Sequence, residues 1–478
     1  MRRSLSYYAL FYVVSLIFMR GSGILAKIFM ARVITPYEYG IITMIVISLP
    51  GILQLVTNFC FFDILGHATE GKKYFSFTLI YGIFSVSCIS LVLYLFQVPL
   101  FNFLNLPADS ANFLLMVLIL VLFSVTISGS LIGILRGMKK HSAAASLSLA
   151  PSVLRLLIIF IAIYIFSISD VNMILIIFAI PAFLVLCAIL LIKWDEIISS
   201  LNSINLPSKE ILMFGFAIFI VNSWGTLGQH INRIVISHNL GIEWQGYFDV
   251  SLTLAALLTF FSSALYNISI PESTGATDKK DIFSKKGGLG DIGRLFLSMS
   301  FLFVLVIYFY SEQIIEILFS ADYAPSGDYL IIIVIGYVFL YVQQFIAFTN
   351  ISLSERTSNK FVTIILLSLI VYPFFTHYMM EYFGFMGAYA SSTIIIIAYT
   401  FTTYIYAKEK FPMILLLQGF EKLVLSIIIT FFIIYLFKPP FVFGSIFLST
   451  IYVASLFILR YLDKDIFAEI MGKKDIDT

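Results

Sequence analysis

A small group of cationic side chains lies inside apolar runs of the sequence, where a charge is costly. They are Arg20, Lys27, Arg155 and Arg233. A cation near the centre of a bilayer costs from about 2.5 to more than 10 kcal/mol, so it normally faces a cavity or an anionic partner. Arginine can bind phosphate through two parallel hydrogen bonds, and lysine binds it as a point charge. The pattern predicts substrate-binding cations for a phosphate-bearing ligand.

Other interpretations of these cations remain open. Lys27 and Arg233 fall within about two turns of the predicted ends of their helices, where a long side chain can reach the interface. Arg155 could equally pair with a lipid phosphate or a neighbouring side chain. Arg20 lies about 20 Å along its predicted helix, too deep for that explanation. Asp63 is a candidate counter-ion for Arg20, or an ion or proton site; a structural salt bridge fits equally well.

Uncharged polar side chains recur at roughly helical spacing along the run 210–237. They could hydrogen-bond to sugar hydroxyls, or they could join neighbouring helices. The sequence leaves both interpretations open. These candidate sugar contacts are Asn222, Gln229, His230 and Asn232.

The composition indicates that these residues lie in a lipid bilayer. The chain has 478 residues, of which 60% are hydrophobic, 17% aromatic and 12% charged. A soluble domain carries roughly 25% charged residues. The composition therefore excludes a soluble enzyme, a nucleic-acid-binding protein and a secreted disulfide scaffold. The cysteines follow no metal-ligand spacing, and we expect no metal and no cofactor.

Apolar runs of about 20 residues predict an all-α polytopic membrane protein with about fourteen transmembrane helices. Of the 29 lysine and arginine residues, four lie deep inside these runs, 23 alternate onto one side of the membrane, and only Arg32 and Lys438 fall on the other. By the positive-inside rule, both termini are then cytoplasmic. We expect a multi-pass protein of the cell membrane. The predicted spans are 7–31, 40–66, 75–99, 110–135, 146–168, 171–192, 210–237, 246–270, 294–318, 328–353, 361–381, 384–407, 414–437 and 441–462.

A weak internal repeat appears at an offset of 206 residues, which aligns Gly40 with Gly246 and Lys27 with Arg233. It predicts two pseudo-symmetric six-helix bundles with a central cleft, formed by residues 1–205 and 206–410. Residues 411–478 would add two helices and a cytoplasmic tail. Parallel repeats around a midplane site are typical of alternating access. We expect the cations of spans 1 and 7 to line one solvent-accessible cavity.

The run from Arg20 to Gly40 ends in Ala-Arg followed by Thr-Pro-Tyr-Glu-Tyr-Gly, and Leu135 to Lys139 reads Leu-Arg-Gly-Met-Lys. Both runs resemble the polysaccharide-flippase branch, which includes O-antigen and teichoic-acid flippases, of the multidrug/oligosaccharidyl-lipid/polysaccharide exporter superfamily. Thr35 stands where glycine is commoner in that family. The resemblance implies a transporter, not an enzyme, that moves a polyprenyl-phosphate-linked glycan from the cytoplasmic to the outer leaflet. Its partners would be the lipid-linked glycan, membrane lipid and other polysaccharide-assembly membrane proteins.

Two other functions were weighed on sequence grounds. An ion-coupled antiporter for drugs or organic cations, in the same superfamily, would favour acids over cations in its cleft. A membrane glycan polymerase or ligase would need a large outer loop rich in arginine and histidine. The predicted loops are short, and the deep charges are mainly cations. Both patterns favour the flippase.

Overall fold

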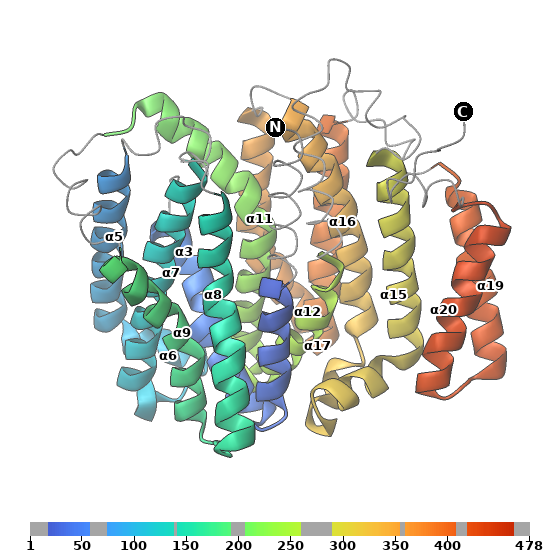
Figure 1. Ribbon diagram of the computed structural model, residues 1–478, viewed down its shortest axis with the longest axis horizontal. Coiled ribbons are helices and arrows are strands. Elements are labelled where there is room, and N and C mark those ends of the chain that lie inside the picture. The colour runs from blue at the N-terminus through green and yellow to red at the C-terminus, as the bar shows by residue number, and fades with distance from the viewer. Residues whose placement is uncertain are drawn as a thin grey trace. The chain divides into compact units, whose positions relative to one another are not determined.

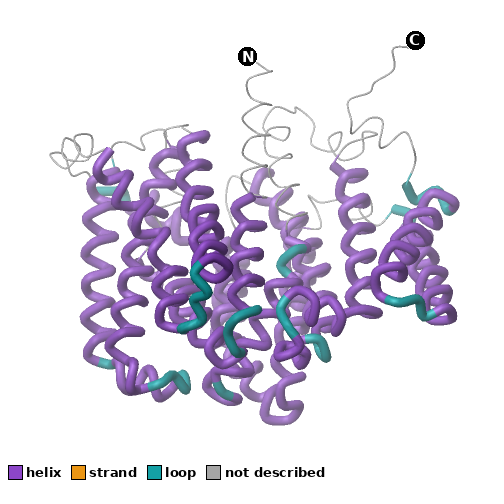
Figure 2. The backbone as a smooth tube through the Cα atoms, turned by 60° about the horizontal axis from the view of Figure 1, so that its bottom comes forward, coloured by secondary structure: helices purple, strands orange, loops and turns teal. Residues whose placement is uncertain are grey.

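The computed structural model describes residues 18–57, 74–137, 141–192, 206–259, 289–353, 359–407 and 418–462. Within these ranges every regular element is helical, as the sequence predicts (Figures 1 and 2). The first helix covers residues 18–31. The remaining elements are α2 (Pro36–Thr43), η1 (Met44–Ser48), α3 (Leu49–Thr57), α5 (Phe75–Leu95), α6 (Gln97–Phe103), η2 (Ala108–Ser110), α7 (Ala111–Gly137), α8 (His141–Phe160), η3 (Ile161–Ile165), α9 (Val171–Ile192), α11 (Lys209–Leu240), α12 (Ile242–Ala255), α15 (Leu289–Leu318), η4 (Ala321–Ser326), α16 (Leu330–Leu353), α17 (Asn359–Ala407), α19 (Phe420–Phe437) and α20 (Phe441–Ile458).

Helix α2 begins at a capping box that is visible in the sequence. The Glu38 side chain accepts a hydrogen bond from the Thr35 backbone N–H (2.9 Å), and the Glu38 N–H donates to the Thr35 hydroxyl (3.4 Å). Pro36 occupies the first turn, where its missing N–H costs nothing. The Thr-Pro-Tyr-Glu run therefore ends the preceding loop and starts a helix at a defined residue.

Helix α17 is two helices joined at Gly384. This glycine has φ +55° and ψ −139°, a conformation that an L side chain rarely adopts. A Cβ on Gly387 would lie 2.1 Å from the carbonyl oxygen of Met379, so the backbone turns tightly there. The Tyr372 hydroxyl donates to Ser392 (3.3 Å), which places the two arms side by side. The predicted spans 361–381 and 384–407 correspond to these arms.

Nine helical segments of the described residues are long and apolar enough to cross a membrane. One of them, Ile365–Ile405, contains both arms of α17. The protein is therefore a multi-pass α-helical membrane protein. The total of fourteen spans stays a prediction, because several predicted spans lie partly outside the described residues.

The chain forms two compact units. Unit 1 comprises residues 1–250, 318–323 and 357–392. Unit 2 comprises residues 251–317, 324–356 and 393–478. These units are defined by contact density, whereas the predicted domains follow the sequence repeat, so the division at residues 205 and 410 stays a prediction.

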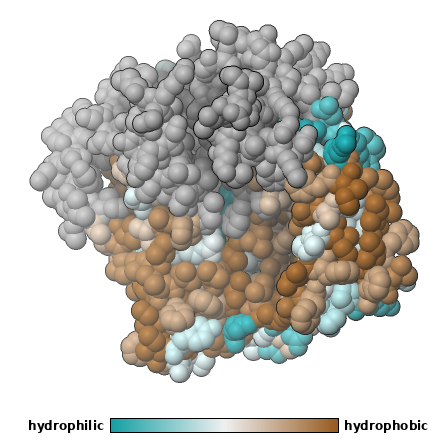
Figure 3. Space-filling view, turned by 45° about the vertical axis from the view of Figure 1, so that its right-hand side comes forward, coloured by the Kyte–Doolittle hydropathy of each residue, from teal (hydrophilic) through white to brown (hydrophobic). Residues whose placement is uncertain are grey.

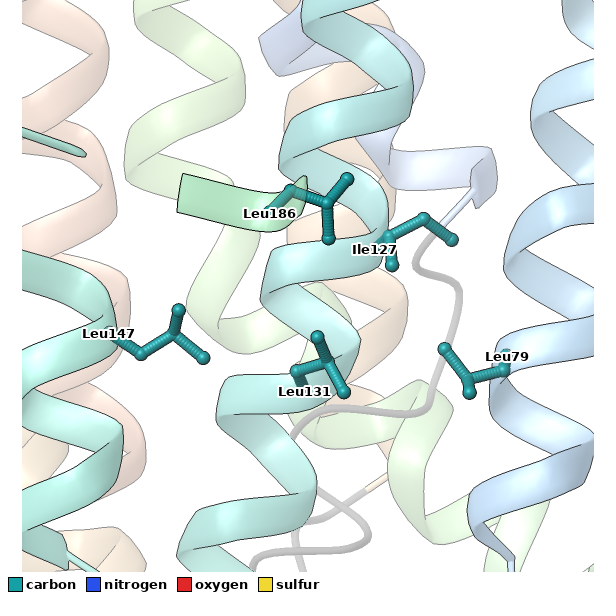
Figure 4. Close-up of a cluster of buried hydrophobic side chains, with 5 residues drawn as sticks. All are labelled: Leu79, Ile127, Leu131, Leu147 and Leu186. Carbon is teal, nitrogen blue, oxygen red and sulfur yellow. The ribbon is translucent and has the colours of Figure 1, made fainter. Parts of the chain in front are cut away.

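Four helices of unit 1 meet at a cluster of aliphatic side chains (Figure 4). Leu79 comes from α5, Ile127 and Leu131 from α7, Leu147 from α8 and Leu186 from α9, and all are at most 7% exposed. In a bilayer the lipid tails are as apolar as leucine, so such contacts stabilise helices through close packing. The cluster holds together the helices that flank the charged site.

Unit 2 combines interhelical hydrogen bonds with an apolar exterior. The Tyr452 hydroxyl of α20 donates to the Ser298 carbonyl of α15 (2.9 Å), and Tyr341 of α16 donates to Gly293 (3.0 Å). In the coloured part of the face drawn in Figure 3, which shows the described residues, most of the surface is apolar. Helices α15, α16 and α17 also line an apolar cavity of about 450 Å³, together with Phe420.

Candidate functional site

The carboxylate of Asp249, in α12, is the centre of a buried ionic cluster in unit 1. Its Oδ2 atom accepts hydrogen bonds from Lys27 Nζ (2.8 Å) and the Tyr39 hydroxyl (3.0 Å). Its Oδ1 atom accepts a hydrogen bond from the Arg233 guanidinium. The Asp249 side chain is completely buried, and the side chains of Lys27 and Arg233 are 15% and 5% exposed. The cluster ties together residues 18–31, α2, α11 and α12.

A close crossing of α2 and α12 brings these side chains together. A Cβ on Gly40 would lie 2.2 Å from the carbonyl oxygen of Ile242, and one on Gly246 would lie 2.2 Å from that of Pro36. Real Cβ atoms essentially never approach so closely, so each helix requires a glycine at the crossing. Tyr39 and Asp249 flank this crossing and join it through their hydrogen bond.

Each contact at the crossing has a counterpart. The counterpart joins the two residues that are equivalent to the first two under the repeat offset of 206 residues. Gly40 meets Ile242 just as Gly246 meets Pro36, and these are equivalent positions in the predicted repeat. Beside the Tyr39–Asp249 hydrogen bond, Gln245 donates to the Thr43 hydroxyl (3.0 Å). Gln245 is equivalent to Tyr39, and Asp249 is equivalent to Thr43. The alignment of Gly40 with Gly246 therefore pairs residues that exchange contacts in space.

A second reciprocal set lies at the ends of the preceding helices. Arg32 Nε donates to the Leu318 carbonyl at the end of α15 (3.1 Å). At the equivalent position, the His238 ring contacts the Phe103 carbonyl at the end of α6 (2.9 Å). Asn105 adds a hydrogen bond to the Ser237 carbonyl (2.6 Å). Polar side chains at both places thus bind carbonyl groups near a helix end.

Two cations of the described residues, Lys27 and Arg233, share the carboxylate of Asp249. Among the buried polar atoms of the described residues, Arg233 Nε is one that has no hydrogen-bond partner. The Arg233 guanidinium also contacts Nδ1 of His230 (3.2 Å). Such a group is poised to receive a further acceptor.

The structure brings together some of the predicted binding residues. Lys27, Arg233 and His230 lie in the cluster, and Arg20 is a partly buried residue about two turns from Lys27 on the same helix. Arg155 donates from Nε to the Phe178 carbonyl (3.0 Å) and lies over the Phe178 ring, 4.3 Å from its centroid. The cavity predicted between the cations stays a prediction.

The remaining predicted residues are placed differently. Asn232 donates to the Ala388 carbonyl (3.2 Å) and to Ser392, so it joins α11 to α17 as the alternative interpretation of the polar run suggests. Gln229 is partly buried. Asp63 and the side chain of Asn222 lie outside the described part of the chain.

Sequence reasoning missed Asp249, although a signal was present. Asp249 is the single charged residue of the apolar run 246–270. An intramembrane acid is a functional candidate for the same reason as an intramembrane cation. Tyr39 and Thr43 gave no such signal, because tyrosine and threonine are common in transmembrane helices and only the fold brings them to Asp249 and Gln245.

Comparison with known protein families shows the family to which the chain belongs. A family model described as "Polysaccharide biosynthesis protein" matches residues 8–274, more than half of the chain. The chain belongs to this family. The match includes the first helix, α2, α11 and α12, so Lys27, Tyr39, Arg233 and Asp249 of this polysaccharide biosynthesis protein all lie within the matched residues. The family resemblance stated from the sequence is thereby confirmed.

A curated relative supports the same assignment. The capsular polysaccharide biosynthesis protein CapF of Staphylococcus aureus is 25% identical over 243 residues, which are 50% of this chain and 60% of that protein. The match thus spans less than two thirds of the length of the relative.

Solved structures show the same fold. A structure of the lipid II flippase MurJ in an inward closed conformation aligns with a TM-score of 0.68 at 14% identity, covering 97% of this chain and 100% of that one. An inward-facing multidrug resistance MATE family transporter of the MOP superfamily aligns with a TM-score of 0.57 at 16% identity, covering 83% and 97%. A MOP superfamily transporter from Pyrococcus furiosus aligns with a TM-score of 0.56 at 14% identity, covering 85% and 94%. The polysaccharide biosynthesis protein therefore has the fold of flippases and multidrug exporters.

Proposed function

We propose that this protein is a flippase that moves a polyprenyl-phosphate-linked oligosaccharide from the cytoplasmic to the outer leaflet of the cell membrane, for the assembly of a surface polysaccharide. The observation that carries the proposal is the buried cluster in which Lys27 and Arg233, from two different helices, both bind the carboxylate of Asp249. Membership of the polysaccharide biosynthesis family and the MurJ-like fold support the same substrate class.

In this mechanism the cations bind the phosphate group while the polyprenyl tail remains in an apolar environment. Arg233 offers an Nε–H without a partner, and Lys27 is the more exposed of the two cations. Arg20 and Arg155 extend the positive charge along the path of the phosphate. Gln229 and His230 of α11 remain the candidate sugar contacts among the described side chains. Transport by alternating access requires no covalent chemistry and no cofactor.

The second candidate is an ion-coupled antiporter for drugs or organic cations. Asp249 favours it, because a buried acid can attract a cationic substrate, and MATE transporters share the fold. In this chain, however, the carboxylate already accepts hydrogen bonds from two cations. These two cations would repel an organic cation, so the flippase is the better supported function. A glycan polymerase or ligase has no comparable structural observation in its favour.

A transport assay tests the proposal. The purified full chain would be reconstituted into liposomes carrying a labelled polyprenyl-pyrophosphate oligosaccharide, and the appearance of the glycan at the opposite leaflet would be followed without nucleotide. We expect protein-dependent translocation that Arg20→Ala and Arg233→Gln reduce by at least about tenfold, the effect of losing one charge-assisted hydrogen bond. The control is Arg460→Gln, which changes an arginine of the other unit. Gradient-driven efflux of an organic cation without glycan translocation would contradict the proposal.

A further inference from the structure

The carboxylate of Asp249 occupies hydrogen-bond donors that a substrate phosphate would need. Lys27 Nζ and the Arg233 guanidinium both donate to it. A carboxylate and a phosphate accept hydrogen bonds from these groups in the same way. Within the proposed function, Asp249 and the substrate therefore compete for the same cations.

The site has room for a stronger acceptor. A guanidinium carries five N–H donors in a fixed planar arrangement. Arg233 uses some of them on Asp249 and His230, but its buried Nε–H has no partner. An anion with several oxygens could bind the Nε–H together with a second N–H of the same guanidinium. A phosphate satisfies this arrangement better than the single Asp249 oxygen does.

Displacement of Asp249 would also affect the helix crossing. Asp249 follows Gly246 by less than one turn of α12, and its partner Tyr39 directly precedes Gly40 in α2. A completely buried carboxylate that loses two cationic donors loses two charge-assisted hydrogen bonds, and the hydrogen bond from the Tyr39 hydroxyl does not replace them. Movement of α12 away from α2 would relieve this cost by letting water reach the carboxylate.

We propose that Asp249 is an exchangeable internal counter-ion: the substrate phosphate displaces it from Lys27 and Arg233, and its release loosens the crossing of α2 and α12. The proposal rests on the proposed function. It makes Asp249 a positioning residue that couples substrate binding to the conformational change. It also predicts that binding and transport respond in opposite directions when the carboxylate is removed.

The test uses Asp249→Asn, which keeps the shape of the side chain and removes its charge. Binding of a fluorescent polyprenyl-pyrophosphate-linked sugar and the rate of its translocation would be measured on the same preparation. We expect Kd to fall by about tenfold or more, since one charge-assisted interaction of the cations is released, while the translocation rate falls by at least about tenfold. Asp322→Asn, the same change at an exposed position of η4, is the matched control and should alter neither quantity.

The outcomes separate this proposal from the proposed function. If wild-type protein fails to bind the probe, the proposed function itself fails. If wild-type protein binds it and Lys27→Gln does not, the site is correct. In that case, unchanged or weaker binding by Asp249→Asn would overturn the counter-ion exchange and leave Asp249 a structural residue.

A second measurement leaves Asp249 in place, so it does not depend on the folding of that variant. Thr43 and Gln245 contact each other across the crossing and would be replaced by cysteines, with Cys60, Cys88 and Cys187 changed to alanine. A short bifunctional thiol reagent would report how often the two positions meet. We expect the probe to slow cross-linking several-fold. An unchanged or faster reaction with the probe bound would contradict the loosening of the crossing.

Discussion

The helix pair formed by residues 18–31 and α2 and the pair formed by α11 and α12 provide two versions of the same arrangement. Each pair carries a glycine at the crossing, Gly40 or Gly246, against a backbone carbonyl of the other pair. Each also carries a buried or largely buried cation, Lys27 or Arg233. The shared glycines allow the helices to cross closely, and the shared cations give the site its positive charges.

The two pairs differ at one equivalent position, where the first has Thr43 and the second has Asp249. Thr43 makes a neutral hydrogen bond with Gln245, whereas Asp249 binds both cations and Tyr39. One crossing therefore holds a neutral contact and a charged contact at equivalent positions. The comparison points to a role for Asp249 in the charge of the site.

The largest effect is expected from alanine at the crossing glycines. Gly40→Ala and Gly246→Ala each place a Cβ 2.2 Å from a backbone carbonyl, so each should lower the free energy of unfolding by about 1–3 kcal/mol or more. Thermal unfolding in detergent would measure the loss. Gly21→Ala is the matched control, because nothing lies within 4 Å of its Cβ. If either crossing variant were as stable as Gly21→Ala, the reciprocal crossing would be wrong.

An intermediate effect is expected from moving the carboxylate between the two pairs. Asp249→Thr should reduce translocation by at least about tenfold, and adding Thr43→Asp should restore most of it. The reason is that Lys27 and Arg233 exchange places under the offset of 206 residues, so an acid at position 43 would face the same two cations. The liposome assay would measure both variants. A double variant no more active than Asp249→Thr would show that the two positions are not equivalent.

The smallest effect is expected at the helix ends. Arg32→Ala and His238→Ala each remove a side chain that contacts a helix-terminal carbonyl at an exposed position. Each variant should lose about 0.5–1.5 kcal/mol of stability at most, and translocation should stay within about twofold of wild type. Parallel thermal unfolding curves would test whether the two losses are similar. A large loss of stability in one variant alone would show that the two helix ends are not equivalent.

Much of the fold could be predicted from the sequence because the bilayer imposes strong constraints. Apolar runs of about 20 residues must form helices, since each backbone group needs an internal partner in lipid. The Thr35–Glu38 capping box and the turn at Gly384 are local signals of the same kind. The number of spans stays a prediction, because several predicted spans lie partly outside the described residues.

The candidate site could be predicted only in part. Lys27 and Arg233 attract attention because a charge is costly in lipid, and the repeat offset brings them to equivalent positions. Their shared partner Asp249 required the fold, since the hydrogen bond between Lys27 and Asp249 joins residues 222 positions apart. The capping of the Phe178 carbonyl by Arg155 was equally inaccessible, because it depends on how α8 and α9 pack.

The most direct test of the account compares two lipid-linked glycans with the same sugar and the same polyprenyl tail. One carries a pyrophosphate linkage and the other carries no phosphate, and their translocation by wild-type protein and by Arg233→Gln would be measured in liposomes. The account predicts that wild-type protein translocates the pyrophosphate-linked glycan and not the phosphate-free one, and that Arg233→Gln loses this preference. Equal translocation of both glycans by wild-type protein would contradict the claim that the Lys27–Asp249–Arg233 cluster recognises phosphate.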